Sequence, residues 1–97
     1  MNIIKSSVAG TMESSDIMIT VEPGSGSIEL DLKSQVEKQF GRQIRSIIMK
    51  TLSELQVKSA KVSAVDKGAM DCTIQARLKT AVQRAAGESA GDWRLPK

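Results

Sequence analysis

The apolar residues of this chain change their spacing at Ser34, and this change constrains the fold more than any other feature. Before Ser34, apolar side chains recur at every second position in two short runs, which is typical of half-buried β-strands. After Ser34, they recur at steps of three and four, which is typical of an amphipathic helix. The spacing therefore predicts two strands followed by a long helix.

The two strands are predicted over residues 16–22 and 28–33. In the second run, apolar residues alternate strictly with charged ones, so one face is expected to be buried and the other solvated. Proline, glycine and serine fill residues 23–27, a composition that favours a turn. We therefore expect the two strands to pair as a hairpin.

The helix is predicted from Ser34 to about Gln56. Its apolar stripe should pack on the sheet. The residues of this stripe are Val36, Phe40, Ile44, Ile47, Ile48, Leu52 and Leu55.

The last third of the chain predicts a second hairpin and a second helix. Alternating residues indicate strands over 60–64 and 70–75, with a turn at residues 66–68. From Ala76 the spacing becomes helical, and Gly87 provides a stop signal.

Together these elements predict an α+β fold of order ββαββα. We expect a four-stranded, mostly antiparallel sheet with the helices packed on one face. If the second and third predicted strands are parallel neighbours, their connection should be right-handed. Residues 1–97 should form a single domain, with residues 1–15 as a flexible arm and residues 88–97 as an irregular tail.

Composition excludes several classes of function. The chain has no histidine, which removes Ser/His and Cys/His nucleophile pairs and every histidine-containing metal site. No glycine-rich phosphate loop opens a helix, so a self-sufficient enzyme is not expected. A membrane protein is not expected either, because no apolar run approaches the roughly 20 residues that a membrane span needs.

The single cysteine and the distribution of cations narrow the possible location and ligands of the chain. Cys72 is alone, which excludes an intrachain disulfide and favours a cytoplasmic location. It alternates with Met70 and Ile74, so we expect a buried and unreactive thiol. The net charge is +3, but the cations are scattered and only Phe40 and Trp93 are aromatic, which argues against nucleic-acid binding.

The segment Val8–Asp16, V-A-G-T-M-E-S-S-D, resembles the modification segment of the citrate lyase acyl carrier (gamma) subunit family. In that family the pattern is A-G-T, a hydrophobic residue, E-S, a small residue and D, followed by an apolar strand. Residues 36–41, 66–72 and 76–78 also match at corresponding spacing, so the similarity covers nearly the whole chain.

The resemblance implies that the chain is a non-catalytic carrier subunit and that Ser14 is its attachment site. In the family this serine carries 2'-(5''-phosphoribosyl)-3'-dephospho-CoA through a phosphodiester bond. Its thiol holds acetyl and citryl thioesters while citrate is cleaved to acetate and oxaloacetate. The implied partners are the alpha (transferase) and beta (lyase) subunits and a prosthetic-group transferase. Ser15 stands where the family often has glycine, and this second hydroxyl leaves Ser15 as an alternative to the favoured Ser14.

Two other interpretations stay open at this point. One is the carrier subunit of malonate decarboxylase, which uses the same type of arm, although the match in the long helix favours citrate lyase. The other is an interaction module without a prosthetic group, in which Ser14 would be an ordinary solvated serine. A carrier would benefit from a mobile arm, because Ser14 must enter the clefts of other enzymes.

Overall fold

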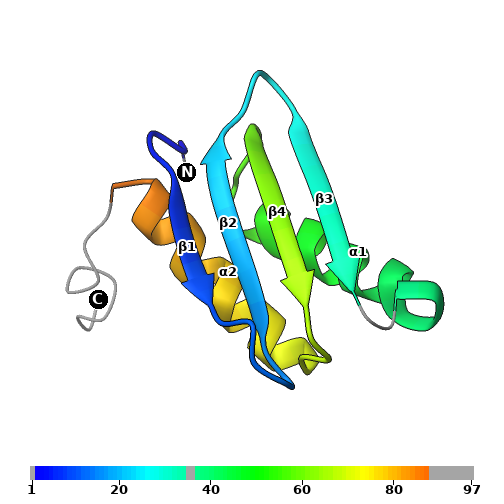
Figure 1. Ribbon diagram of the computed structural model, residues 1–97. Helices are drawn as coiled ribbons and strands as arrows, with labels where there is room; N and C mark the ends of the chain where they lie inside the picture. The colour runs from blue at the N-terminus through cyan, green and yellow to red at the C-terminus, as the bar shows by residue number, and fades with distance from the viewer. Residues whose placement is uncertain (1, 35–36, 88–97) are drawn as a thin grey trace.

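The computed structural model describes residues 2–34 and 37–87, and at residues 37–39 it describes only the backbone. The predicted tail, residues 88–97, lies outside the described residues. Figure 1 labels the elements. In chain order they are β1 (Ser7–Gly10), β2 (Ile17–Pro23), β3 (Ile28–Ser34), α1 (Glu37–Glu54), β4 (Ala60–Asp66) and α2 (Asp71–Ala85).

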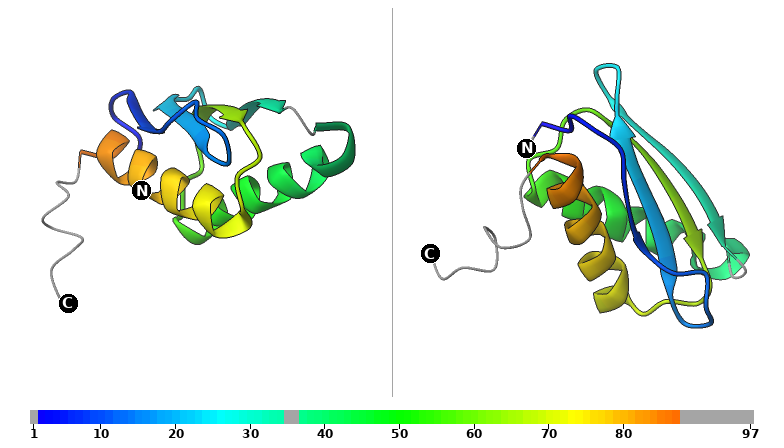
Figure 2. Two further views of the ribbon diagram at one scale, coloured as in Figure 1. Left: turned by 60° about the horizontal axis from the view of Figure 1, so that its bottom comes forward. Right: turned by 60° about the vertical axis from the view of Figure 1, so that its left-hand side comes forward.

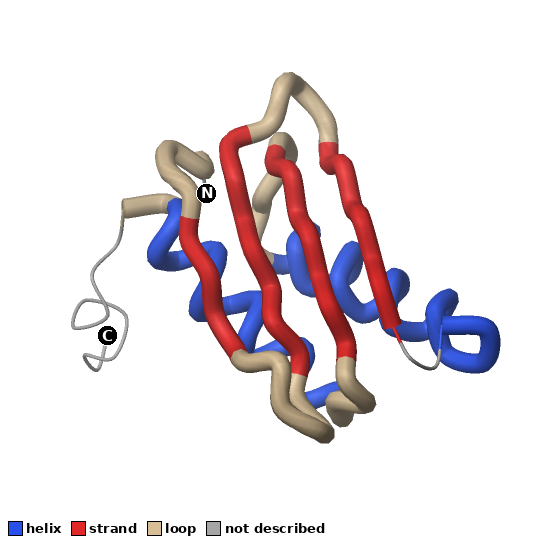
Figure 3. Tube along the Cα trace, viewed as in Figure 1, coloured by secondary structure: helices blue, strands red, loops and turns tan. Residues whose placement is uncertain are grey.

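The four strands form one mixed sheet in the order β1-β2-β4-β3 (Figure 3). β1 pairs antiparallel with β2, β2 pairs antiparallel with β4, and β3 pairs parallel with β4. Both helices cover the same face of this sheet (Figure 2). The predicted α+β class, the mostly antiparallel sheet of four strands and the single helical layer are therefore confirmed.

The core lies between the sheet and the two helices. Alternate residues of the strands point into it, while residues such as Glu29, Asp31 and Lys61 are exposed on the opposite face. The largest fully buried apolar side chains are Ile17, Ile19, Val21, Ile48, Leu52, Val62, Ile74, Leu78 and Val82. The alternation seen in the sequence thus separates a buried face from a solvated one.

The order of elements is βββαβα, so the predicted order ββαββα is wrong at both ends. Ser7–Gly10, predicted as part of a flexible arm, is strand β1. Residues 70–75, predicted as a strand, belong mostly to α2, because the buried Ile74 continues a helical stripe to Leu78 and Ala81. Cys72 is exposed in the first turn of this helix, so its predicted burial is also wrong.

Both predicted hairpins are wrong as well. The first fails because β4 is inserted between β2 and β3, and the second fails because the partner predicted for β4 belongs to α2. The connection at residues 24–27 crosses the start of β4 instead of reversing the chain onto its neighbour (Figure 1). Gly24 permits this crossing, since a Cβ there would lie 2.4 Å from the backbone nitrogen of Ala60. The backbone N–H of Ala60 also donates to the carbonyl oxygen of Ser27 at 3.2 Å.

The connection from β3 through α1 to β4 is left-handed. In Figure 1 both strands point downward and β4 lies to the left of β3, while Figure 2 places α1 behind the sheet as seen in Figure 1. β3 and β4 are parallel neighbours, which was the condition for the expected right-handed crossover, so that expectation is wrong. The opposite face of the sheet carries charged side chains, so α1 packs on the face that α2 covers. Because β4 lies between β2 and β3, the chain must turn inward from β3, and this makes the crossover left-handed.

The predicted stripe of α1 is only partly buried, and its member Val36 lies outside the described residues. Ile47 and Leu55 are partly buried and pack against the core. Ile44, Ile48 and Leu52 lie in the core. Phe40 was predicted to join them, but its side chain is 48% exposed near the start of the helix. This side chain faces a groove that is described below.

Candidate functional site

Ser14 lies in the loop between β1 and β2, at the end of the sheet where β4 leads into α2 (Figure 1). Its side chain is exposed, and no hydrogen bond joins its hydroxyl to another described residue. The flanking residues Glu13 and Ser15 are exposed too. The hydroxyl is therefore accessible to another protein.

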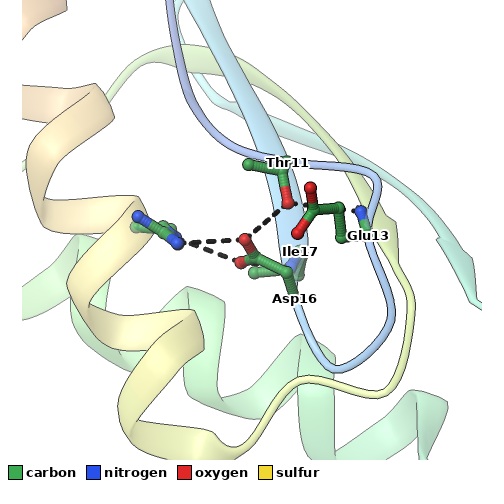
Figure 4. Close-up of polar contacts among 5 residues, drawn as sticks. Thr11, Glu13, Asp16 and Ile17 are labelled. Carbon is green, nitrogen blue, oxygen red and sulfur yellow. Dashed lines mark hydrogen bonds and ion pairs between the residues drawn. The ribbon is translucent and has the colours of Figure 1, made fainter.

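Asp16 fastens this loop to the body of the domain (Figure 4). Its carboxylate accepts hydrogen bonds from Arg77 of α2, with Nε to Oδ1 at 3.1 Å and Nη2 to Oδ2 at 3.0 Å. Oδ2 also accepts from the Thr11 hydroxyl at 2.7 Å, and Oδ1 accepts from the backbone N–H of Ile17 at 2.7 Å. One side chain thus joins the two ends of the loop to a helix that lies far away in the sequence.

These contacts set the ionisation of Asp16. The hydrogen bond from Arg77 is the largest cause that holds the pKa of the Asp16 carboxyl well below its ordinary value. The Thr11 hydroxyl and the Ile17 backbone N–H act in the same direction. The Asp16 side chain is only 13% exposed, yet it is a carboxylate with all of its donors in place.

A second attachment runs through the backbone of Lys67, in the connection between β4 and α2. The N–H of Ser15 donates to the carbonyl oxygen of Lys67 at 2.8 Å, and the N–H of Lys67 donates to the carbonyl oxygen of Asp16 at 2.9 Å. This pairing is accompanied by a φ of 65° at Ser15, in the left-handed region that favours glycine. Ser15 therefore adopts a backbone conformation that glycine would adopt with less strain.

Gly10 shapes the other end of the loop. Its φ is 94°, and a Cβ at this position would lie 1.8 Å from the carbonyl oxygen of Ile17. No other residue type fits there without moving the backbone of β1 or β2. The loop therefore leaves β1 along a path that requires glycine.

The described surroundings of Ser14 contain few chemically active groups. No basic side chain contacts the Ser14 hydroxyl among the described residues, so nothing in this part of the chain would activate it as a nucleophile. Within residues 2–34 and 37–87, no group of three or more suitable side chains is placed to hold a metal ion. An exposed, unbonded serine on an anchored loop fits a hydroxyl that a separate enzyme modifies.

Sequence reasoning identified Ser14, Ser15 and Asp16 within one segment, and the structure keeps all three in the loop. It missed Arg77 and Lys67, which hold that loop from α2 and from the β4–α2 connection. Arg77 carried no signal in the sequence, because it resembles the other scattered cations of the last third of the chain.

Comparisons with known proteins agree with this geometry. The acyl carrier family described as the malonate decarboxylase delta subunit (MdcD) matches residues 4–85. A citrate lyase acyl carrier protein from Streptococcus uberis is 57% identical over 94 residues, which cover 97% of this chain and 93% of that protein. Its counterpart from Streptococcus mutans is also 57% identical, over 95 residues, with the same shares covered. The chain belongs to this acyl carrier family.

The fold of this acyl carrier is also found in a solved structure. It is similar to a chain in the crystal structure of a Pseudomonas malonate decarboxylase hetero-tetramer in complex with malonate, with a TM-score of 0.76 and 86% of each chain covered. The two sequences are 15% identical, so this likeness concerns the fold alone. The relatives of this chain are named as carrier proteins. Membership of an acyl carrier family implies a covalently attached prosthetic group. Neither described helix has the length and apolar character to cross a membrane.

Proposed function

We propose that this carrier is the acyl carrier subunit of a citrate lyase complex and that its prosthetic group is attached to the Ser14 hydroxyl. The citrate lyase assignment is supported by 57% identity over nearly the full chain. The attachment site is supported by the exposure of Ser14 on a loop that Asp16, Ser15 and Lys67 hold at its base. The cytoplasmic location expected from the single cysteine stays a prediction.

The proposed group is 2'-(5''-phosphoribosyl)-3'-dephospho-CoA, joined to Ser14 through a phosphodiester. When bound, it supplies a thiol that carries acyl groups as thioesters. The chain itself positions the attachment point. The Asp16–Arg77 pair and the Lys67 backbone hold the end of the loop that enters β2, and the hydrogen bond from Thr11 to Asp16 ties the other end to it. Ser14 is exposed between these ends, where a modifying enzyme can reach it.

The proposed partners are the alpha (transferase) and beta (lyase) subunits of citrate lyase and a dedicated prosthetic-group transferase. A carrier with an exposed tether raises the concentration of the thioester at neighbouring active sites, typically to about the millimolar range. Malonate decarboxylase is the alternative assembly, favoured by the family model and the fold. We prefer citrate lyase because the curated relatives with that name share far more sequence with this chain.

Intact mass spectrometry tests the attachment site. The chain is co-expressed with a citrate lyase prosthetic-group transferase and the enzymes that make its substrate, and its mass is compared with that of the chain expressed alone. Wild type should gain the mass of one arm, whereas Ser14→Ala should gain none. Removing an exposed hydroxyl should change the free energy of unfolding by less than about 0.5 kcal/mol.

Ser15→Gly is the matched control. It removes the neighbouring hydroxyl and provides the residue best suited to a φ of 65°, so the folded state should be retained or stabilised by up to about 1 kcal/mol. This variant should load fully. Loading of Ser14→Ala at the wild-type level, together with loss of loading in Ser15→Gly, would move the site to Ser15.

A further inference from the structure

A groove of about 390 Å³ opens beside the loop that carries Ser14. Phe40, Gln43 and Ile44 of α1 form one wall of this groove. The connection between β4 and α2 forms the other wall, with Gly68 and Ala69 among its residues. The volume lies within the range of about 300–1,000 Å³ that is usual for small-molecule sites.

The groove and the Ser14 loop share a wall. Lys67, which exchanges backbone hydrogen bonds with Ser15 and Asp16, stands between Asp66 and Gly68, and both of these line the groove. Figure 1 shows the β1–β2 loop and the β4–α2 connection at the same end of the sheet. A group tethered to Ser14 would therefore start next to this groove.

The lining of the groove suits the uncharged parts of such a group better than its phosphates. Its apolar lining comes from Phe40, Ile44 and Ala69. The exposed residues Gln43 and Asp71 form a polar rim, in which Gln43 Nε2 lies 3.2 Å from each carboxylate oxygen of Asp71. None of its described lining residues is basic. Phosphates would be repelled by this rim, but an uncharged chain of amides and methylenes would find both apolar contact and hydrogen-bond acceptors.

Asp66 is a structural residue of this wall. It is fully buried, and its carboxylate accepts hydrogen bonds from the Ser34 hydroxyl and from the backbone N–H groups of Gly68 and Ala69. These bonds hold the β4–α2 connection in the shape that leaves the groove open. The other side-chain acceptors among the lining residues are those of Gln43 and Asp71.

Phe40 provides the most direct indication of a ligand. Phe40 lines the groove and is 48% exposed, whereas Ile44, Ile48 and Leu52 of the same stripe are buried. Hydrophobic and aromatic side chains are the usual lining of small-molecule sites. Covering this ring would remove apolar surface from water at no cost in backbone ordering.

We propose that this groove holds the pantetheine end of the arm, the uncharged, amide-linked part that ends in the thiol, between visits to partner enzymes. The inference rests on the proposed attachment at Ser14. Because the arm is tethered, an effective concentration of about a millimolar allows even weak contacts to fill the groove while still releasing the arm to a partner. The groove is thus a resting site and not a second attachment site.

NMR of the loaded full-length chain tests the groove separately from the attachment. Intact mass first establishes that the arm is present. Phe40 is the only phenylalanine of the chain, so selective labelling gives one set of ring signals. The ring of Phe40 and the amides of Gly68 and Ala69 should shift on loading, and the ring should show nuclear Overhauser contacts with methylene protons of the arm.

The amides of Gly24, Gln56 and Val57, which line a larger groove at the other end of the domain, should not shift. A loaded chain whose shifts are confined to residues 11–16 would overturn the groove proposal and leave the attachment intact. A chain that gains no mass would defeat the proposed function, and the resting site with it.

A matched pair of variants sharpens this test. Phe40→Ala removes the ring from the groove, whereas Met49→Ala removes a side chain of similar exposure, 43%, from the same helix outside the groove. Both variants should fold and gain the mass of the arm. Phe40→Ala should lose the loading-dependent shifts of Gly68 and Ala69, and Met49→Ala should keep them. Unchanged shifts in Phe40→Ala would overturn the proposal.

Discussion

Asp16 and Arg77 lie 61 residues apart in the sequence, and their side chains form a bidentate ion pair that joins the Ser14 loop to α2. Arg77 is 42% exposed, so the pair is expected to add little to the stability of the whole domain. Its effect is local, because the same carboxylate also binds Thr11 and the Ile17 backbone. We therefore regard Asp16 as the residue that fixes the shape of the loop.

This arrangement predicts a pH dependence for the contribution of Asp16. Because its pKa is lowered in the folded state, the carboxylate stabilises the domain fully above its unfolded pKa of about 3.9. This contribution should be lost as the pH falls from about 4 through the folded pKa. Urea unfolding followed by circular dichroism should therefore show wild type to be more stable than Asp16→Asn at pH 7, with the difference shrinking in acid.

Asp31→Asn is the control for that experiment. Asp31 is an exposed carboxylate on the open face of the sheet, and no hydrogen bond joins its side chain to another described residue. The stability difference between wild type and this variant should be small throughout. If wild type and Asp16→Asn differ by the same amount in acid as at neutral pH, the charge of Asp16 contributes nothing.

Gly10→Ala should destabilise the domain by roughly 3 kcal/mol or more, because it combines backbone strain with a steric clash. The added Cβ would lie 1.8 Å from the carbonyl oxygen of Ile17 and force β1 away from β2. Gly26→Ala separates the two causes, since φ there is 109° but nothing lies within 4 Å of a Cβ. It should cost only about 1–2 kcal/mol in urea denaturation. Equal losses in the two variants would show that the close approach at Gly10 is unimportant.

The spacing of apolar residues located most of the elements but could not show how they pair. β2, β3, β4 and α1 were predicted close to their observed bounds, because each buries one face along a regular period. Strand order was not predictable in this way, since a loop that crosses β4 has the same glycine-rich composition as a hairpin turn. Long-range pairing depends on contacts that a local period does not encode.

The two misassigned segments have specific physical causes. In β1, the small Ala9 is buried and the larger Val8 is 47% exposed, so the apolar pattern does not reveal the buried face. In the segment that starts at Met70, apolar residues at every second position imitated a strand, but only Ile74 is buried and its stripe is helical. Short runs of this length are compatible with either period.

The candidate site was only partly visible in the sequence. Ser14 was found through the resemblance of its segment to a known family, because nothing in composition distinguishes one exposed serine from another. Arg77 could not be paired with Asp16 from the sequence, since the contact depends on how α2 lies against the β1–β2 loop. The groove near Phe40 required the structure for the same reason.

Cys72 should react rapidly in the native, unmodified protein. The sequence predicted an inert thiol, but the structure exposes it in the first turn of α2. A maleimide added without denaturant should label it fully, at a rate within about tenfold of that for the unfolded chain, as expected for an exposed thiol. Cys72→Ala should retain the fold and the loading of the arm. Labelling slower than in the unfolded chain by a factor of about a hundred or more, on the order expected for a buried thiol, would contradict the exposed position.

Mobility of the arm is best tested by backbone NMR relaxation on the unmodified domain. The sequence predicted that residues 1–15 move freely, whereas β1 and the Asp16 contacts favour a held base with a smaller mobile tip. We expect order parameters near 0.85 for β1 and at Asp16, as in rigid backbone, and lower values for Met12 and Ser14, which are exposed at the tip. Arg77→Gln should lower the values from Thr11 to Ser15 by releasing one end of the loop. Order parameters below about 0.6 throughout residues 7–15 in wild type would support the freely mobile arm instead. If Arg77→Gln leaves the order parameters unchanged, the ion pair does not help to position Ser14.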